Sequence, residues 1–339
     1  MNIIIVGFGT AGKHYFNLLK SKKISKIFIL DKLSLPKSEK FKQISFEEIK
    51  KKKLFFDYAI IASPSGLHYK HALFFLENGS NVLIEKPFVL RLDHAKKLIS
   101  ISSQKKLKCW TSLQNRYNLA TTKLKSEINS HSIGKISLVD CMMLWHRDKK
   151  YYSNNWRGKY SSDGGVLTNQ AIHLLDTLIF NFGKIKSFDA YAEFNKNKLE
   201  AEDLITINFR HQNGILSSFK ATTRANKNYR SAIDIIGEKG RIIIKGISLN
   251  TFSKFKNNNL MLNKKFSENF GENLGAAGGM GFGHKKILNE FLVKNKKSSK
   301  KLEIKENYYL LKVIHSIYNC IHKSKKINKI EDKNSILGK

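Results

Sequence analysis

The stretch NIIIVGFGTAG, residues 2–12, decides the fold of this chain. Asn2–Val6 is an apolar run of strand length, and Thr10–Ser21 carries apolar side chains at helical spacing. Between them lies a Gly-x-Gly-x-x-Gly turn, in which glycines let the backbone turn tightly and approach a pyrophosphate at the helix N-terminus. We therefore predict the start of a Rossmann fold, and we assign cofactor contacts to every residue of the turn: Gly7, Phe8, Gly9, Thr10, Ala11 and Gly12.

An acidic residue stands where such a fold holds the adenosine ribose. Asp31 ends the second predicted strand, Lys26–Leu30, and follows Gly12 by 19 residues. A carboxylate there accepts hydrogen bonds from the ribose hydroxyls and repels a 2′-phosphate. The sequence therefore predicts NAD rather than NADP, although the ammonium of Lys32 could pair with such a phosphate. For the glycines alone, the alternative is an ordinary strand-to-helix turn.

Strands and helices alternate through residues 1–118. Further strands are predicted at Tyr58–Ala62, Asn81–Ile84 and Leu107–Thr111, and helices at 67–77 and 91–103. This alternation is typical of a parallel, doubly wound α/β sheet. We predict that residues 1–118 form an NAD-binding domain.

Longer strands follow, and they predict a second α+β domain at 119–325 with an open, mainly antiparallel sheet. Asn213-Gly214 is a hairpin signal, and 238–240 is another turn. Helices are expected at 170–181, 285–293 and 307–322, a long loop at 257–283, and a mobile basic tail at 326–339. The predicted strands are Lys135–Trp145, Lys184–Phe194, Leu204–Arg210, Gly214–Thr223, Ser231–Gly237 and Arg241–Lys245.

The length of 339 residues fits two domains, since one domain has roughly 150 residues. Its formal net charge of +34 could indicate nucleic-acid binding. However, only 8 of the 61 basic residues are arginine, the lysines are scattered, and no zinc-finger or aromatic RNA-binding pattern is present. We therefore predict no nucleic-acid partner, and a positive field that favours an acidic small substrate.

The cysteines and the apolar runs bear on the compartment. The three cysteines are far apart and show no disulfide framework or paired metal spacing, which fits a reducing cytoplasm and no metal. No signal peptide is evident, and no apolar run approaches the ~20 residues that cross a bilayer. We predict a cytoplasmic protein without a membrane partner.

Three further segments make a family resemblance specific: IIASPSGLH at 60–68, VLIEKP at 82–87 and GGVLTNQAIHLLD at 164–176. In this order and spacing the chain resembles the glucose–fructose oxidoreductase / inositol dehydrogenase / rhizopine catabolism family (Gfo/Idh/MocA). The resemblance implies a dehydrogenase that acts on a secondary alcohol of a carbohydrate. It also implies a homodimer or homotetramer formed through the second domain's sheet.

The resemblance also implies roles for individual residues. Lys86 matches the family's active-site lysine, His173 matches its histidine, and Asn169 stands where many members have aspartate. We assign catalysis to these three. The cofactor contacts implied beyond the turn and Asp31 are Ser63, Pro64, His68, Glu85, Lys86, Asn115, Trp156 and Arg157. The substrate contacts implied are Lys86, Arg116, Tyr152, Asn169 and His173.

The chemistry explains why these residue types are needed. Oxidising an alcohol removes a hydride and a proton, and His173 suits the role of base because histidine titrates near neutral pH. Lys86 can hydrogen-bond the same oxygen and stabilise developing negative charge. Asn169 cannot carry charge, so it cannot stabilise an imidazolium as aspartate would. Without the motif, His173 would be an ordinary helix residue and Lys86 a surface lysine.

The segments around 63–68 and 169–173 look most like the nucleotide-sugar branch of the family. That branch oxidises C3 of a UDP-sugar resembling UDP-N-acetylglucosaminuronate, for surface polysaccharide synthesis. The nearest alternative is a free-sugar or inositol dehydrogenase. From other classes, we weigh a non-catalytic dinucleotide sensor and a basic nucleic-acid-binding protein that kept a Rossmann core.

Overall fold

The computed structural model divides the chain into two compact units. Unit 1 consists of Met1–Ser112 and His284–Tyr309, and unit 2 of Leu113–Gly283 and Leu310–Lys339. The segment from 284 to 309 therefore belongs with the first unit, although it follows the second in sequence. The predicted limits of the functional domains stay a prediction. The structure describes residues 1–20, 22, 24, 26–153, 156–194, 199–256, 259–265, 283–293, 300–323 and 329–339.

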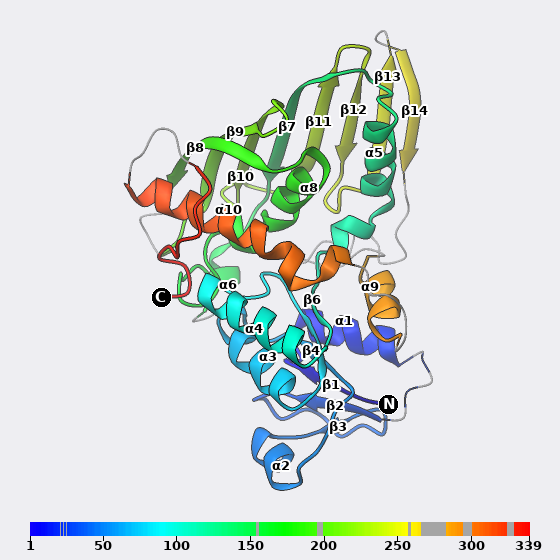
Figure 1. The fold of residues 1–339 in the computed structure, drawn as a ribbon, viewed down its shortest axis with the longest axis vertical. Helices are drawn as coiled ribbons and strands as arrows, with labels where there is room; N and C mark the ends of the chain where they lie inside the picture. Colours follow the sequence, from blue (N-terminus) through cyan, green and yellow to red (C-terminus); the bar gives the residue numbers. More distant parts are fainter. Residues whose placement is uncertain are drawn as a thin grey trace. The chain divides into compact units, whose positions relative to one another are not determined.

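Unit 1 is built on a six-stranded, wholly parallel sheet with the order β3-β2-β1-β4-β5-β6 (Figure 1). The strand order reverses between β1 and β4, and ligands of such sheets bind where the order reverses, outside the carboxyl ends. The predicted α/β fold is confirmed. The strands are β1 (Asn2–Val6), β2 (Lys26–Leu30), β3 (Lys42–Gln43), β4 (Tyr58–Ile61), β5 (Asn81–Ile84) and β6 (Cys109–Thr111).

The helices of unit 1 pack apolar faces against this sheet. The three predicted between residues 10 and 104 are present. The sequence analysis missed β3, which is only two residues long, and α2. A capping box marks α2, because Ser45 and Glu48 each hydrogen-bond the other's backbone N–H. The helices are α1 (Thr10–Leu19), α2 (Phe46–Lys51), α3 (His68–Glu77), α4 (Leu92–Gln104) and α9 (Gly283–Phe291).

Unit 2 contains an eight-stranded sheet with the order β14-β13-β12-β11-β7-β10-β9-β8. Only the β7–β10 pair is parallel, and the predicted hairpins join β9 to β10 and β11 to β12 in antiparallel register. The mainly antiparallel second sheet is thereby confirmed. The strands are β7 (Ile136–Leu144), β8 (Ile185–Glu193), β9 (Leu204–His211), β10 (Leu216–Thr222), β11 (Arg230–Gly237), β12 (Gly240–Lys245), β13 (Thr251–Lys256) and β14 (Asn259–Lys265).

The long loop predicted at 257–283 is wrong in part. Residues 259–265 form β14, which pairs with β13 at the edge of the sheet. The apolar residues of this edge strand are consecutive and largely exposed, as are its polar ones, so the alternation that marks a half-buried strand is missing. Residues 257–258 and 266–282 of the predicted loop lie outside the described residues.

Helices cover one face of this sheet, as Figure 1 shows for α5, α8 and α10. α5 packs on β12 and β13, α7 on β9 and β10, and α8 on β7. The sequence analysis missed α5, which begins after Asn118, whose side chain caps the helix by accepting the Ala120 N–H at 2.9 Å. The bounds are α5 (Leu119–Asn129), α6 (Lys149–Tyr152), α7 (Val166–Asn169), α8 (Ile172–Phe182) and α10 (Ile304–Lys323).

The mobile tail expected at 326–339 is also wrong for the residues that are described. Residues 329–339 pack on unit 2, where Ser335 Oγ lies 2.8 Å from His315 Nδ1 and the Gly338 N–H donates to Tyr160 O at 2.8 Å. The Leu337 side chain is fully buried. It lies so close to Gly164 that a Cβ there would meet Leu337 at 3.0 Å. Burial of the Leu337 side chain thus holds residues 329–339 in unit 2, although the segment is basic.

Replacing Leu337 by alanine should lower the free energy of unfolding by about 2–5 kcal/mol, because it removes a fully buried side chain and leaves a cavity. Urea unfolding monitored by circular dichroism measures the change. The neighbouring Ile336→Ala is the control, since Ile336 is 36% exposed and should change stability by less than about 1 kcal/mol. Equal effects of the two substitutions would contradict the packing of this segment.

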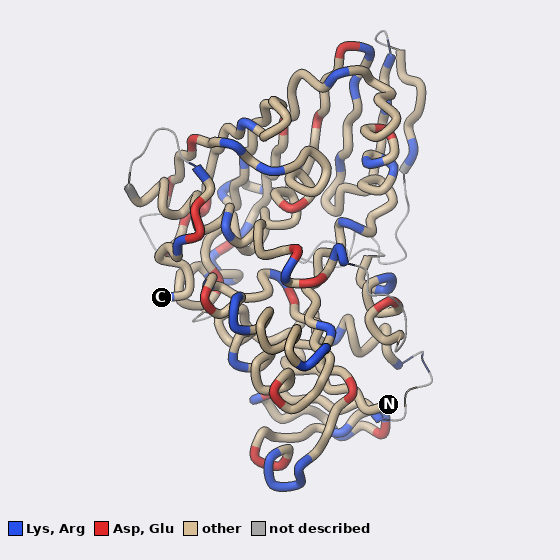
Figure 2. The backbone as a smooth tube through the Cα atoms, in the orientation of Figure 1, with Lys and Arg blue, Asp and Glu red and all other residues tan. Residues whose placement is uncertain are grey.

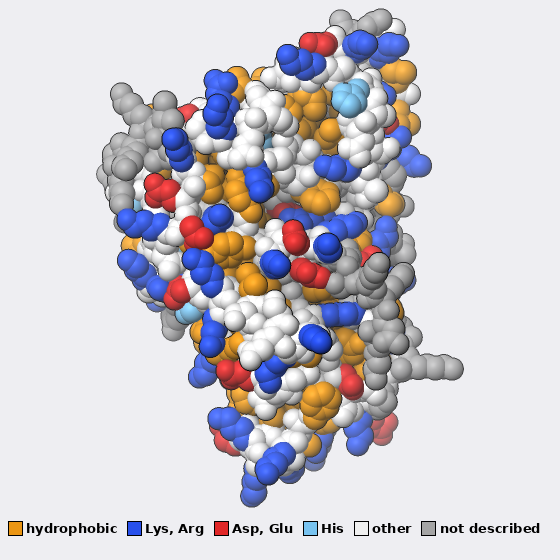
Figure 3. Space-filling model, viewed as in Figure 1, with side chains coloured by type: hydrophobic (Ala, Val, Ile, Leu, Met, Phe, Trp, Pro, Cys, Tyr) orange, Lys and Arg blue, Asp and Glu red, His pale blue; other side chains and the backbone are white. Residues whose placement is uncertain are grey.

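Basic residues are distributed along the whole chain rather than gathered in one element (Figure 2). On the face drawn in Figure 3 they stand among uncharged and apolar side chains. Within the described residues, no helix combines the length and the apolar character needed to cross a bilayer. The predicted absence of a nucleic-acid partner stays a prediction.

Candidate active site

The glycine-rich turn follows β1 at the point where the strand order of unit 1 reverses. Gly7 has a φ of +92°, and a Cβ there would lie 2.6 Å from Ala62 O, while a Cβ on Gly12 would lie 2.0 Å from Gly7 O. Both positions therefore require glycine. Gly9 caps α1 without a side-chain acceptor for the first amides, and the space around its Cα is open. These open, uncapped amides fit a pyrophosphate group.

Asp31 holds this turn in place. Its carboxylate accepts the backbone N–H of Phe8 at 2.6 Å and that of Leu33 at 2.9 Å. A carboxylate has about four lone-pair positions, so it can still accept hydrogen bonds from ribose hydroxyls. The Phe8 ring instead packs against Phe16 and Phe41, with centroids 5.7 Å away in both cases. The ring and the backbone N–H of Phe8 are therefore both engaged within unit 1.

His68 joins the loops after β4 and β5. The ring is buried, and its two nitrogens lie 2.8 Å from the carbonyl oxygens of Ser63 and Pro87. Ser63 Oγ lies 2.9 Å from Nδ1 of His71, the second histidine of α3. The sequence analysis expected His68 to contact the cofactor. The structure engages both of its ring nitrogens with main chain, which gives His68 a positioning role.

Glu85 fixes the main chain at Lys86 from inside unit 1. The buried carboxylate accepts the Tyr15 hydroxyl at 2.8 Å and, more weakly, the Lys86 N–H at 3.3 Å. Tyr15 Oη in turn lies 2.8 Å from Ser112 Oγ, and His284 Nε2 is 3.5 Å from the carboxylate. Burial alone would raise the pKa of Glu85, but His284 and the Lys86 charge outweigh it and lower the pKa to about 2. The ionised carboxylate thus holds the loop that carries Lys86.

His173 lies in the first turn of α8 in unit 2. Its Nε2 is 3.1 Å from the side-chain nitrogen of Gln114. An amide nitrogen can only donate, so Nε2 is the accepting, unprotonated nitrogen of a neutral imidazole. This is the form that a general base requires. The sequence analysis missed Gln114, although it directly precedes the Asn115-Arg116 pair that the analysis singled out.

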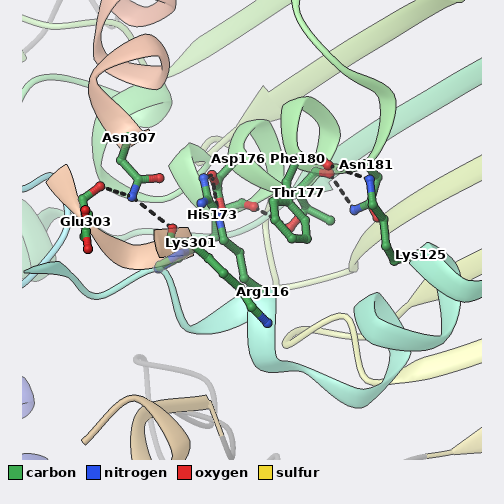
Figure 4. Close-up of polar contacts among 10 residues, drawn as sticks. All are labelled: Arg116, Lys125, His173, Asp176, Thr177, Phe180, Asn181, Lys301, Glu303 and Asn307. Carbon is green, nitrogen blue, oxygen red and sulfur yellow. Dashed lines mark hydrogen bonds and ion pairs between the residues drawn. The ribbon is translucent and has the colours of Figure 1, made fainter. Parts of the chain in front are cut away.

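A buried ion pair between Arg116 and Asp176 lies beside His173, as Figure 4 shows. Arg116 Nε lies 2.9 and 3.1 Å from the two carboxylate oxygens of Asp176, and the guanidinium carbon lies 4.9 Å from the Phe180 ring centroid. Arg116 was expected to contact substrate. Its guanidinium ties the segment that carries Gln114 to the helix that carries His173, and its contact with substrate stays a prediction.

Asn169 is the last residue of α7, and a carboxylate lies beside it. Its amide nitrogen donates to Asp163 Oδ2 at 2.5 Å and to the Tyr151 hydroxyl at 3.2 Å. Gln170 donates to the same hydroxyl at 3.1 Å. Asp163 is buried. The acidic group that the motif lacks at position 169 is therefore supplied nearby by Asp163, which the sequence analysis missed.

Four other predicted site residues also lie in unit 2. Tyr152 places its hydroxyl 2.9 Å from Thr223 Oγ1, and burial raises its pKa to about 12. Arg157 donates to the Tyr151 carbonyl at 3.0 Å and stacks over the Trp156 ring. Asn115 is half-buried, and its side chain makes no hydrogen bond to the described residues, so its amide can serve a ligand.

Side-chain and backbone oxygens of Glu202 cap the N-terminus of α7. Its carboxylate accepts the Leu167 N–H at 2.9 Å and the Tyr318 hydroxyl at 3.1 Å, and its carbonyl accepts the Val166 N–H at 2.8 Å. The side chain is almost fully buried. Burial outweighs these hydrogen bonds and raises its pKa from 4.5 to about 7.

The raised pKa predicts a pH dependence of stability. The folded state favours the protonated form of Glu202, so its contribution to the free energy of unfolding is complete below pH 4.5. As the pH rises through 7 this contribution is lost, which lowers the free energy of unfolding by about 3 kcal/mol in total. Glu202→Gln should therefore raise the free energy of unfolding at pH 8 by about 1–3 kcal/mol and leave it nearly unchanged at pH 5. Urea unfolding at the two pH values measures this. The exposed Glu200→Gln is the control, and an equal response of both variants would contradict the assignment.

Family models match both parts of the chain. Residues 1–113 match an oxidoreductase family described by an NAD-binding Rossmann fold. Residues 121–243 match the GFO/IDH/MocA C-terminal domain. The chain belongs to the GFO/IDH/MocA oxidoreductase family. The predicted family and the NAD-binding first domain are confirmed.

Curated relatives of this GFO/IDH/MocA chain are distant. It is 24% identical to the scyllo-inositol 2-dehydrogenase (NADP(+)) IolW of Bacillus subtilis over 59% of the chain and 56% of the relative. It is 25% identical to the D-glucoside 3-dehydrogenase of Escherichia coli over 40% of the chain and 39% of the relative. The matched region thus spans about half or less of these relatives.

Solved structures share the fold over nearly the whole chain. The WlbA dehydrogenase of Chromobacterium violaceum, in complex with NADH and UDP-GlcNAcA, has a TM-score of 0.80 at 23% identity, covering 97% of this chain and 95% of its own. Its counterpart from Bordetella pertussis, with the same ligands, has a TM-score of 0.78 at 22% identity over 98% and 99%. At these identities the likeness establishes the fold of this family member.

Proposed function

We propose that this GFO/IDH/MocA chain is an NAD-dependent dehydrogenase that oxidises a secondary hydroxyl of a nucleotide sugar. The reaction carries the hydroxyl of C3 in a UDP-linked sugar acid to a ketone. The observation that carries the proposal is the neutral His173 in α8, whose unprotonated Nε2 is oriented by Gln114 at 3.1 Å. A scaffold or sensor would have no need of a base held in this form.

Names and ligands of similar proteins support the substrate class. The two WlbA structures contain UDP-GlcNAcA, and the D-glucoside relative is named for oxidation at position 3. A net charge of +34 favours the capture of an anionic substrate.

The roles of the residues follow from their chemistry. NAD, when bound, accepts the hydride from the sugar carbon. In this proposal the open amides at Gly9 hold the pyrophosphate, and Asp31 accepts hydrogen bonds from the adenosine ribose. His173 takes the hydroxyl proton at Nε2 once the substrate hydroxyl replaces the Gln114 N–H as hydrogen-bond donor to that nitrogen, and Lys86 donates a hydrogen bond to the same oxygen as negative charge develops on it. The remaining predicted cofactor contacts, including Ser63 and Pro64, stay predictions.

The test is the formation of NADH, followed at 340 nm, with a panel of UDP-sugars, UDP-sugar acids, free sugars and inositols. Turnover with a UDP-sugar acid and none with free sugars is the expected result. A protein that binds NAD and turns over none of these, even with a 2-oxo acid added to reoxidise retained cofactor, would refute the proposal.

A free-polyol dehydrogenase is the second candidate, because the relatives include two scyllo-inositol 2-dehydrogenases (NADP(+)). The same panel decides between them when NAD and NADP are both supplied. The carboxylate of Asp31 predicts a preference for NAD in either case.

The oligomer implied by the family is proposed to form on the open face of the eight-stranded sheet. Leu138 on β7 lies opposite Leu216 on β10 and Ile236 on β11, and each of the three is at least 40% exposed. A second copy would cover this apolar row. Ile236→Asp should shift the molar mass from light scattering to that of a monomer, whereas Leu33→Asp in unit 1 should not. A monomeric wild type would contradict the proposal.

A further inference from the structure

Two arginines gather on one tyrosine ring in unit 2. Arg147 follows β7, Arg157 follows α6, and their guanidinium carbons lie 5.2 and 4.0 Å from the ring centroid of Tyr151. Each guanidinium also lies 4.9 Å from a tryptophan ring centroid, that of Trp145 for Arg147 and that of Trp156 for Arg157. We name Arg147, Tyr151 and Arg157 the arginine cluster.

The two charges of the arginine cluster are not neutralised. Among the described residues, no carboxylate lies within 4.0 Å of either guanidinium. Arg157 donates only to the Tyr151 carbonyl at 3.0 Å, and Arg147 to the His146 carbonyl at 2.6 Å and the Asn228 side chain at 3.4 Å. Two like charges held on one ring without a counter-charge favour the binding of an anion.

The other six arginines are either paired with a carboxylate or, in the case of Arg210 and Arg230, exposed on strands. Arg91, Arg116, Arg224 and Arg241 each lie within 4.0 Å of a carboxylate. Arginine is also scarce here, with 8 residues among 61 basic ones. Its planar fork matches the two oxygens of a carboxylate or phosphate better than the lysine ammonium does. An unpaired pair of arginines in a lysine-rich chain therefore indicates a specific ligand.

Tyr151 adds a third donor and links the arginine cluster to the candidate site. Its hydroxyl oxygen accepts N–H groups from Asn169 and Gln170 at 3.2 and 3.1 Å. The hydroxyl proton has no acceptor among the described residues, so it is available to a ligand. The one carboxylate close in sequence, Asp148, is engaged in capping α6 by accepting the Tyr151 N–H at 2.8 Å. The cluster thus presents donors, and the neighbouring Asp163 carboxylate is engaged by the Asn169 amide.

We propose that the arginine cluster binds an oxyanion of the substrate, either the sugar carboxylate or the diphosphate. This inference rests on the proposed function and names the part of the substrate that unit 2 recognises. It assigns Arg157 to the substrate, whereas the family resemblance implies a contact with the cofactor. Asn169, which holds Tyr151, is four residues before His173, so the anion is bound next to the helix that supplies the base.

Direct binding tests the inference without turnover. Two of the three tryptophans, Trp145 and Trp156, lie against the cluster, and the third, Trp110, is buried in unit 1. Tryptophan fluorescence should therefore report binding of UDP, of glucuronate and of UDP-glucuronate. Arg147→Gln and Arg157→Gln should each weaken the cluster's ligand roughly 10- to 100-fold, the usual effect of losing a charge-assisted hydrogen bond. The affinity for NADH, measured by NADH fluorescence, should stay within about twofold.

The ligands distinguish the two sources of the oxyanion. Weakened glucuronate with unchanged UDP assigns the sugar carboxylate, and weakened UDP with unchanged glucuronate assigns the diphosphate. Arg210→Gln is the matched control, because Arg210 is an exposed arginine of β9 and its loss tests general electrostatic attraction. Arg147→Lys and Arg157→Lys keep the charge without the fork, and they replace the glutamine variants if these fail to fold.

Two results would overturn the inference: an equal effect of the cluster variants and of Arg210→Gln on every ligand, or a loss of NADH affinity alone. Failure of the proposed function looks different, because a chain that binds these anions through the cluster but oxidises no nucleotide sugar keeps the anion site and loses only the reaction.

Discussion

Lys86→Met should reduce turnover by at least ~10²–10³-fold, the effect of removing a hydrogen-bond donor from a developing oxyanion. Lys86 follows β5 at the carboxyl end of the parallel sheet, and the ionised Glu85 beneath it holds its main chain. Methionine is unbranched and only one atom shorter than lysine, and it removes the charge. The loss should fall on kcat, because the donor is needed most when negative charge develops.

The measurement is NADH formation at 340 nm under saturating substrate, together with the dissociation constant of NADH. That constant should change less than threefold, roughly 0.6 kcal/mol, since the pyrophosphate is held elsewhere in this proposal. The exposed Lys97→Met on α4 is the control for general loss of charge. If Lys86→Met retained wild-type kcat, Lys86 would have no part in the chemistry.

His173→Gln should reduce kcat by ~10²–10⁴-fold, the usual contribution of a general base. Glutamine can keep a hydrogen bond to Gln114 but cannot accept a proton, so the variant separates the position of the side chain from its basicity. It should also lose the acid limb of the kcat/KM profile, where the wild-type base becomes protonated.

The pH profile makes this test specific. A merely structural histidine would lower activity at every pH and leave the shape of the profile intact. His131→Asn is the control, because His131 is exposed and has a φ of +51°, which asparagine tolerates. A His173→Gln variant with an unchanged acid limb would assign the base to another group.

The sequence was most informative where backbone geometry limits the choice of residue. Gly7 and Gly12 could be assigned because a Cβ at either position would collide with main chain, so any sequence that makes this turn must show glycine there. Most strands of both sheets could be assigned because one or both faces are buried, and burial imposes a readable apolar pattern. The exceptions besides β14 are β3, with two residues, and β13, which were not predicted. Where burial is absent, as in β14, the pattern is absent too.

By itself, the sequence determined the parallel first sheet, the antiparallel second sheet, the family and the NAD-binding domain, because each depends on local periodicity or on a contiguous motif. Only the tertiary structure decided the partners of the individual side chains. It placed Arg116 on Asp176, brought Asp163 to Asn169, and gathered Arg147 and Arg157 on one ring. These groups come from separate segments, and no local spacing encodes which charged group finds a partner when the chain folds.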